Sequence, residues 1–440
     1  MNAFLAILLL APQSFPPKLP DGKEVVTDTS EDFLKPASTL KGGVAVAKAA
    51  PTVDVLFFPC QKYPGKPWST WGDNLVANGK VYCSLGDHLA ADSRKAAEST
   101  GTGFVYEYDP AAKKLKELVD VSKLLALPAG HYTPGKIHGR LDMGDDNWVY
   151  FSTHRGSTRV TTDQYHYKGD WVFRTNPATG QSEVLVCGAV PKHCVPTSVL
   201  DPKRLIFYGG TAPGTGGDDE GVQFFAYDVK AKKVLYSGPD GPSRYMIFAK
   251  STGRVYWVPG KDDMVGGLVR WDPEKGGAPE KLPATLGLRA ASQETPQGMV
   301  YSVSKGGRGG AATLYAFNTK TETAEALGEA AVGTHGYIAS LDADPAGRYL
   351  YYCGGAHGGS DTDGTPIVQY DVRTRQRKVI AFLHPYYRQK YGFAPVGTYA
   401  TAIDEKGEVL YVVFNVNRAG RAWDVVALFA IHIPASERQP

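Results

Sequence analysis

The chain has 440 residues, with 50 glycines, 30 prolines, 25 tyrosines and 11% aromatic residues overall. This mixture is typical of many short strands joined by turns and excludes a mainly helical protein. The net charge is only +3, with basic and acidic residues interspersed, so no whole-molecule field favours nucleic acid as a partner.

The N-terminal segment "MNAFLAILLLAPQSF" contains an apolar run of the length found in signal peptides. The run is too short to cross a bilayer, and we expect no membrane span elsewhere. We therefore predict a signal peptide over 1–14 and a linker or loosely held arm, rich in Pro, Lys, Ala and Ser, over 15–50. The expected location is secreted or periplasmic.

One triplet recurs along the rest of the chain, each time after a turn such as "ANGK", "GDDN" or "PAGR". Its seven copies are "VYC" at 81, "VYF" at 149, "IFY" at 206, "VYW" at 255, "VYS" at 300, "LYY" at 350 and "LYV" at 410. A variable loop, a second strand such as "FVYEYDP", a turn and a third strand follow most copies. With the strand before each triplet, every unit holds four antiparallel strands.

Units of four strands at this spacing are the signature of a propeller, because radial stacking buries both faces of each small sheet. The sequence predicts an all-β, seven-bladed β-propeller of four-stranded antiparallel blades over 51–433, with a polar tail at 434–440. The last repeat lacks a fourth strand. We expect "VDVLFF" at 53–58 to supply it, so that an N-terminal strand closes the last blade; an eight-bladed or open ring is the alternative.

Histidines gather on one side of this predicted ring. In an up-and-down blade, the end of the second strand and the segment leading into the next inner strand lie on the same face. Nine of the ten histidines fall in such places: His88, His131, His138, His154, His166, His193, His335, His357 and His384. Exposed histidines have no reason to choose one face, so the pattern indicates a site.

The stretch "GKIHGRLDMGDDNWVYFSTHR" (135–155) shows the pattern within one hairpin. His138 and Arg140 lie at one end of it, and His154 and Arg155 lie at the other. Because a hairpin brings its ends together, we expect the two histidines to be neighbours on the functional face.

Acid–base chemistry is one use of such a face. Removing a proton beside a carboxylate needs a base and cations that offset the enolate charge. The catalytic candidates are His138, His154, Tyr245 and Arg244, and the substrate-binding candidates are Lys136, Arg140, Arg155, Tyr165, Tyr208 and Lys305.

Binding of a divalent metal (Mn, Zn or Ca) is a second possible use of this face, because neutral imidazole is the commonest nitrogen ligand of metals. The candidate ligands are His193, His335 and His357. Separately, Cys187 and Cys194 would pair in an oxidising compartment, although buried free thiols are equally expected.

The four-stranded repeat, with His leading into an inner strand and His again at the end of the next strand, resembles the propeller-fold polysaccharide lyases, the oligogalacturonate and ulvan lyases. The resemblance implies that a His or Tyr abstracts the C5 proton of a uronic acid while an Arg or a metal neutralises the carboxylate. On this chain the matching places are His138 and His154, with Tyr245 and Arg244. His193, His335 and His357 would then be metal ligands, and the partner would be an acidic polysaccharide or oligosaccharide.

Three other functions remain open. A non-catalytic propeller would use the same face to bind a protein or glycan. A gluconolactonase-like, metal-dependent lactonase would use the acidic run Asp218, Asp219 and Glu220. A streptogramin-lyase-like enzyme would also use histidine on a propeller face.

Overall fold

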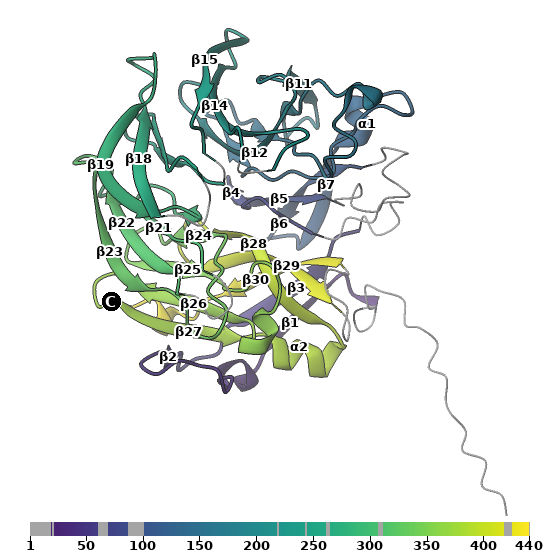
Figure 1. The fold of residues 1–440 in the computed structure, drawn as a ribbon. Coiled ribbons are helices and arrows are strands. Elements are labelled where there is room, and N and C mark those ends of the chain that lie inside the picture. The colour runs from purple at the N-terminus through teal and green to yellow at the C-terminus, as the bar shows by residue number, and fades with distance from the viewer. Residues whose placement is uncertain are drawn as a thin grey trace, which may run out of the picture.

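The computed structural model describes residues 19, 22–59, 69–86, 101–217, 220–242, 244–260, 265–306, 311–417 and 425–439. The strands in these residues form seven sheets around a central axis (Figure 1). The chain is therefore a mainly-β seven-bladed propeller, as the repeat predicts. No helix among the described residues is long and apolar enough to cross a membrane. The predicted signal peptide lies outside the described residues.

Each blade contains four antiparallel strands. In the first six blades, the strand that comes first in the sequence is the innermost one. The first three blades are β4 (Leu75–Ala77), β5 (Lys80–Gly86), β6 (Gly103–Asp109) and β7 (Lys114–Asp120); β8 (Asp142–Met143), β9 (Val149–Ser152), β10 (Trp171–Thr175) and β11 (Ser182–Cys187); and β12 (His193–Asp201), β13 (Ile206–Pro213), β14 (Gln223–Asp228) and β15 (Lys233–Pro239). The next three are β16 (Ile247–Ala249), β17 (Arg254–Trp257), β18 (Val265–Trp271) and β19 (Glu280–Gly287); β20 (Ala290–Ala291), β21 (Met299–Val303), β22 (Thr313–Asn318) and β23 (Thr323–Glu329); and β24 (Leu341–Ala343), β25 (Tyr349–Tyr352), β26 (Pro366–Asp371) and β27 (Gln376–Phe382).

The repeated triplets lie in the second strand of their blades, and their side chains join neighbouring blades. In β5, Val81 and Cys83 pack with residues of the seventh blade, whereas Tyr82 packs with residues of the second. Because successive strand residues face opposite sides, one triplet contributes to two interfaces between blades. This explains why an apolar and aromatic triplet recurs wherever a blade is buried on both faces.

The N-terminal strand closes the ring, as predicted. The seventh blade contains β28 (Ala394–Ile403), β29 (Val409–Asn417) and β30 (Val425–His432), and β3 (Thr52–Phe57) pairs with β30 in antiparallel register. Val55 lies opposite Phe429, and both are fully buried. The first and last parts of the chain therefore share one sheet.

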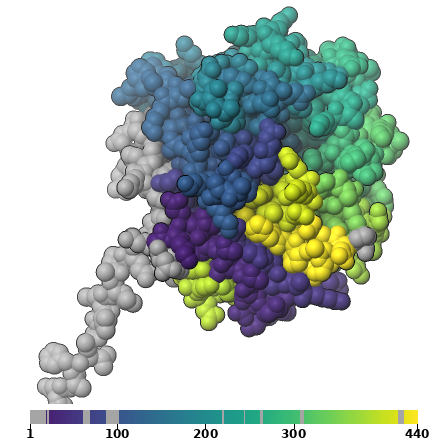
Figure 2. All heavy atoms as spheres, turned by 180° about the vertical axis from the view of Figure 1, so that it is seen from behind, coloured from purple at the N-terminus to yellow at the C-terminus, as the bar shows by residue number. Residues whose placement is uncertain are grey.

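The range 15–50, expected from the sequence to be a linker or arm, contains further strands in its described part. β1 (Val25–Thr29) adds to β3 as a fifth strand, and β2 (Ala45–Val46) pairs in parallel with β27. Figure 2 shows this segment, in purple, against the yellow C-terminal strands. The buried Asp28 carboxylate accepts hydrogen bonds from Tyr386, Lys390 and Tyr391. All three donors belong to α2 (His384–Tyr391).

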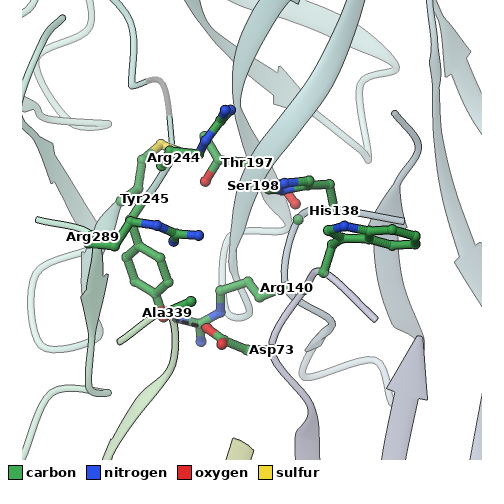
Figure 3. A pocket seen from close by; sticks show the side chains of 13 residues that line it. Asp73, His138, Arg140, Thr197, Ser198, Arg244, Tyr245, Arg289 and Ala339 are labelled. Carbon is green, nitrogen blue, oxygen red and sulfur yellow. Dashed lines mark hydrogen bonds between the residues drawn. The ribbon is translucent and has the colours of Figure 1, made fainter. Parts of the chain in front are cut away.

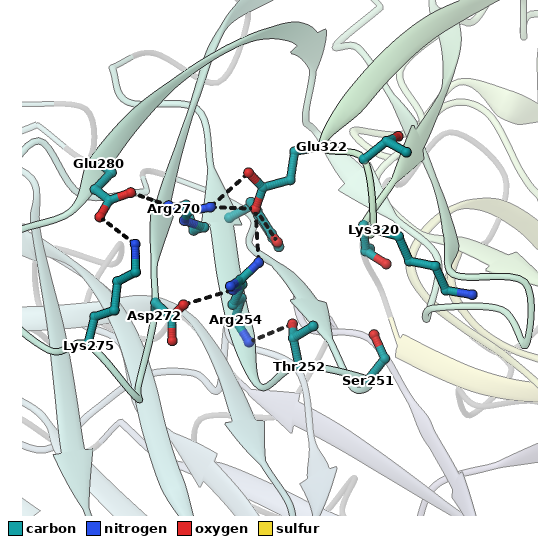
Figure 4. A network of polar contacts seen from close by, with 12 residues as sticks. Ser251, Thr252, Arg254, Arg270, Asp272, Lys275, Glu280, Lys320 and Glu322 are labelled. Carbon is teal, nitrogen blue, oxygen red and sulfur yellow. Dashed lines mark hydrogen bonds and ion pairs between the residues drawn. The ribbon is translucent and has the colours of Figure 1, made fainter.

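On the face opposite to the histidines, ion pairs join the fourth and fifth blades (Figure 4). Glu322, in the turn between β22 and β23, accepts hydrogen bonds of 2.8 Å from Arg270 through both carboxylate oxygens. It also accepts a bond of 3.0 Å from the Tyr256 hydroxyl. The Arg270 and Glu322 side chains are 11% and 18% exposed, so solvent screens this pair less than an ordinary surface pair.

Glu322 also lies 3.5 Å from Arg254. We expect Glu322→Gln to lower the free energy of unfolding by about 2 kcal/mol, because it removes the carboxylate charge that Arg254 and Arg270 share. Urea denaturation measures the change. The matched control is Glu274→Gln, since Glu274 pairs with Arg204 but is 75% exposed, and it should cost less than about 0.5 kcal/mol. Equal effects of the two substitutions would contradict the role assigned to Glu322.

Candidate functional site

The hairpin of the second blade brings its two histidines together. The amide of His154 donates to the Lys136 carbonyl at 2.9 Å, which ties the ends of the hairpin, and the His138 and His154 rings lie 5.3 Å apart. His138 Nδ1 lies 2.8 Å from the carbonyl oxygen of Pro196. A carbonyl only accepts, so Nδ1 carries the proton and Nε2 of the neutral ring holds the basic lone pair.

His138 lines a cavity at the axis of the ring. Six blades contribute to it, five through the segments that lead into their inner strands and the third through Thr197 and Ser198 within β12. The lining residues are Trp71, Gly72, Asp73, His138, Gly139, Arg140, Thr197, Ser198, Arg244, Tyr245, Met246, Arg289 and Ala339. Three of the predicted catalytic residues and the predicted binding residue Arg140 therefore share one cavity.

A hydrogen bond spans the axis inside this cavity. The Tyr245 hydroxyl, from the fourth blade, lies 2.7 Å from Asp73 Oδ2, from the first blade, and 2.9 Å from the Ala291 carbonyl oxygen. Figure 3 shows Tyr245 extending toward Asp73, with the Arg289 guanidinium pointing toward the middle of the cavity. Burial, together with the nearby Asp73 charge, raises the pKa of Tyr245 well above its usual 10.0. Tyr245 therefore keeps its proton at neutral pH and does not serve as an ionised base.

One carboxyl group, that of Asp73, lines the cavity, and a second, that of Asp342, is linked to it through hydroxyl groups. Burial raises the pKa of Asp73, and hydrogen bonds from Ser340 and Tyr245 oppose that shift. Thr401 links this group to the next carboxyl, because its hydroxyl lies 2.7 Å from the Ser340 hydroxyl and donates to Asp342. Burial, which outweighs the Thr401 hydrogen bond, raises the pKa of Asp342 to about 7.

Three arginines line the cavity, Arg140, Arg244 and Arg289, against one carboxylate, Asp73. Arg289 is 3% exposed and donates from Nε to the Tyr337 hydroxyl at 2.9 Å. The Lys136 ammonium lies 5.1 Å from the centre of the Trp71 ring. Arg140 pairs with Asp142 at 2.8 Å, and Arg244 also lines the cavity. Such a site suits an anionic group that approaches from the histidine face.

A wider hollow lies beside the axial cavity. It has a volume of about 490 Å³ and is lined by Lys305, Gly306, His335, Tyr337, Gly355, His357, Gly358 and Gly359. Lys305 was predicted from the sequence as a binding residue, and its ammonium lies 5.7 Å from the centre of the Tyr337 ring. Because Tyr337 also accepts the Arg289 hydrogen bond, it connects the hollow with the axial cavity.

The other four predicted binding residues line neither space: Lys136, which lies beside Trp71, and Arg155, Tyr165 and Tyr208. Tyr208 is fully buried between the third and fourth blades, and its hydroxyl donates to the Gly253 carbonyl at 3.3 Å, toward the opposite face. Arg155 is 4% exposed and donates to the Gly216 carbonyl at 2.9 Å. Tyr165 belongs to a short 3-10 helix (Asp163–Tyr165) and packs against the core of the first and second blades. Strand alternation places the Tyr208 side chain between two blades, so Tyr208 is a core residue.

Cys187 and Cys194 do not form a disulfide with each other. Cys187 is exposed, and its thiol donates to the Gly169 carbonyl at 3.7 Å. Cys194 is buried, and its sulfur lies 2.5 Å from Arg155 Nη1. The thiol of Cys194 thus belongs to the packing around Arg155.

Of the three histidines predicted as metal ligands, His335 and His357 line the same hollow, whereas His193 lies apart from them in the third blade. His193 begins the inner strand of the third blade, where its Nδ1 lies 2.8 Å from the Thr211 hydroxyl. His335 lies in the segment before the sixth blade, with Nδ1 3.3 Å from Asp363 Oδ2. No group of three or more His, Cys, Asp or Glu side chains with metal-site geometry occurs among the described residues. These residues do not fit a three-histidine metal site, and Asp218 and Asp219 lie outside the described residues.

Several residues of the cavity escaped the sequence-based search, which followed histidines. Asp73 and Arg289 lead into the inner strands of the first and fifth blades, as His138 does in the second and Tyr245 in the fourth. Trp71 lies two residues before Asp73 and packs beside Lys136. Trp71, Asp73 and Arg289 share one feature in the sequence: each lies in the segment that precedes an inner strand, so comparison of these segments would have identified them.

No protein-family profile matches the sequence, and no curated protein matches it significantly. An oligogalacturonate lyase in complex with manganese matches with a TM-score of 0.54 at 11% identity, over 95% of this chain and 98% of that one. The oligogalacturonate lyase of Vibrio parahaemolyticus matches with 0.54 at 10%, over 94% and 98%. The WD40 repeats of RRP9 match with 0.52 at 9%, over 92% and 100%. At these identities the likeness shows the fold alone.

The raised pKa of Asp342 gives a testable dependence of stability on pH. The folded protein holds this proton more tightly than the unfolded chain, so the stabilisation is complete below the usual 3.8 and is lost as the pH rises toward about 7. In Asp342→Asn, the decline of the urea midpoint over that range should be shallower than in the wild type.

The control is Asp145→Asn, because Asp145 is exposed in the turn between β8 and β9. Its pH profile should run parallel to that of the wild type. A parallel profile for Asp342→Asn as well would show that the pKa of Asp342 is not raised in the folded protein.

Proposed function

We propose that this propeller is a lyase that cleaves an acidic, uronic-acid polysaccharide or oligosaccharide by β-elimination in the axial cavity. One observation carries the proposal: a basic imidazole, a protonated tyrosine and several arginines share one cavity. Elimination beside a carboxylate needs a base, an acid and cations together. The shared fold with two oligogalacturonate lyases supports the proposal.

His138 is the proposed base. Its Nε2 takes the C5 proton, the C–H electron pair forms the C4–C5 double bond, and the C4–O bond breaks. The leaving oxygen takes a proton, so the products are an unsaturated uronate and a new chain end, with no water consumed. His154 is 2% exposed, so its proposed role is to position His138 rather than to touch the substrate.

Tyr245 is the proposed proton donor. A raised pKa keeps its hydroxyl protonated, and Asp73 orients it at 2.7 Å. Arg244 and Arg289 would offset the charge that moves onto the carboxylate as the enolate forms. No step is assigned to a metal, and an exported location, inferred from the N-terminal sequence, is part of the same proposal.

We expect His138→Asn to lower kcat by a factor of about 10² to 10⁴, because it removes the proton acceptor while an amide still reaches the Pro196 carbonyl. The assay is the ultraviolet absorbance of unsaturated uronate, measured over a panel of uronic-acid polysaccharides with and without EDTA. Tyr245→Phe should also lower kcat, because the donor proton is lost.

The matched control is His166→Asn, since His166 is exposed on the same face of the second blade and asparagine tolerates its φ of 55°. Its kcat should stay near the wild-type value. Absence of unsaturated product from every polysaccharide of the panel with the wild type would overturn the lyase proposal, and absence of bound metal by elemental analysis as well would favour a non-catalytic binding propeller.

A further inference from the structure

A continuous chain of hydrogen bonds leads away from Tyr245 at the axis. The Tyr245 hydroxyl meets the Asp73 carboxyl, and the Ser340 hydroxyl hydrogen-bonds the same carboxyl. The Thr401 hydroxyl lies 2.7 Å from that of Ser340 and hydrogen-bonds Asp342. These five residues, here called the axial chain, connect a carboxyl of the first blade with one of the sixth through two hydroxyl groups.

The two hydroxyl groups in the middle of the axial chain are shielded from solvent. Ser340 and Thr401 are 3% and 1% exposed, and the Thr401 amide donates to Ser340 Oγ at 3.0 Å, which fixes one side chain against the other. Asp73 and Asp342 are both partly exposed. Asp73 lines the axial cavity, so a bound substrate would separate it from water, whereas Asp342 does not line the cavity. Asp342 is therefore the end of the chain that still exchanges protons with water when the cavity is filled.

Both contacts of the Tyr245 hydroxyl are satisfied together when Asp73 carries a proton. The hydroxyl lies 2.7 Å from Asp73 Oδ2 and 2.9 Å from the Ala291 carbonyl oxygen. A hydroxyl has one hydrogen and a carbonyl only accepts, so a bond donated to Ala291 requires the Asp73 carboxyl to donate to Tyr245. Burial favours this protonated carboxyl, because it raises the pKa of Asp73. Tyr245 then has a proton donor directly behind it.

The charged groups around the two carboxyls leave Asp342 able to gain and lose its proton near neutral pH. Arg140 and Arg289 favour the ionised form of Asp73, and Arg140 also favours that of Asp342. The Asp73 charge opposes ionisation of Asp342, and Tyr245 is the other titratable group that faces both carboxyls. Burial outweighs the arginine and the hydrogen bonds, so the pKa of Asp342 is raised to about 7.

We infer that the axial chain is a relay that returns a proton to Tyr245 after each elimination. The inference rests on the proposed function, in which Tyr245 protonates the leaving oxygen and becomes a phenolate. Asp73 gives a proton to the phenolate and takes one from Ser340. Ser340 takes one from Thr401, and Thr401 takes one from Asp342.

Each transfer breaks one O–H bond and forms another, so the net change is one proton moved from Asp342 to Tyr245. Every donor in the chain then points toward Asp342, and the Thr401 hydroxyl donates to the ionised carboxyl. Asp342 recovers its proton from water, and His138 releases to water the proton that it took from the substrate. The cycle therefore closes without any other reactant.

Exchange of the Tyr245 hydroxyl proton with water tests the relay without turnover. In a mixture of light and heavy water, the NMR signal of the Tyr245 Cζ carbon reports this exchange, and its absence in Tyr245→Phe assigns it. Thr401→Val should slow the exchange about tenfold, because valine interrupts the chain of hydroxyls. Thr401→Ser keeps the hydroxyl and should restore the wild-type rate.

The matched control is Thr398→Val. Thr398 belongs to the same strand, β28, and is also 1% exposed, but its hydroxyl donates to the Val413 carbonyl at 2.7 Å. Exchange at Tyr245 should keep its wild-type rate in this variant. Ser340→Ala interrupts the chain at the next hydroxyl and provides the same test if Thr401→Val does not fold.

Turnover provides a second readout. Thr401→Val should lower kcat about tenfold while KM changes less than twofold, and added imidazole buffer should restore most of the loss. A small acid in solution can protonate a phenolate, but it cannot repair a displaced side chain. Rescue by the buffer therefore separates a relay from a structural role.

The outcomes separate the two proposals. Slower exchange in Thr401→Val, without any unsaturated product from the wild type, keeps the proton path to Tyr245 and overturns the lyase. Unsaturated product, with exchange or kcat that ignores both Thr401→Val and Ser340→Ala, keeps the lyase and overturns the relay. A loss of kcat that imidazole does not restore, or equal slowing of exchange in Thr398→Val, also overturns the relay.

Discussion

The pairing of β3 with β30 is the constraint on which the rest of the molecule depends. Without it the seventh blade would keep an open edge, and the seven inner strands would have no reason to meet around one axis. Once the ring is closed, Tyr245 of the fourth blade reaches Asp73 of the first across the axis at 2.7 Å. The cavity is a product of closure rather than of any single blade, and β1 and β2 extend that closure by adding strands to the seventh and sixth blades.

Features set by local periodicity could be predicted from the sequence. The triplets predict the blades because each triplet must bury side chains on both faces of its strand. The hairpin at 135–155 places His138 beside His154 because the two ends of a hairpin lie close together. Contacts between blades leave no comparable local trace. Nothing within a few residues of Asp73 shows that its partner is Tyr245. Tyr208, by contrast, belongs to a triplet, and strand alternation alone would have placed it in the core.

The polar residues of the axis oppose the stability of the ring that holds them. Asp73 and Asp342 are carboxyls with raised pKa values in the middle of a packed structure, and Arg140 and Arg289 only partly offset their desolvation. A ring selected for stability alone would fill its axis with apolar side chains. The concentration of costly groups near the start of the inner strands, on the face that carries the histidines, is the pattern expected of a functional cavity rather than of an ordinary propeller channel.

One face of the propeller holds its blades together, and the other carries the residues that line the cavity and the hollow. On the opposite face short turns hold ion pairs such as Arg270–Glu322, which fasten one blade to the next and take no part in the cavity. On the histidine face the connections are longer and variable, and they carry His138, Lys305, Tyr337 and His357. Because each blade is fixed through its packed strands and its turns on the far side, the loops of the near side are released from a structural role. Seven such loops around one axis can therefore supply a base, an acid, cations and aromatic rings from distant parts of the sequence without disturbing the ring that positions them.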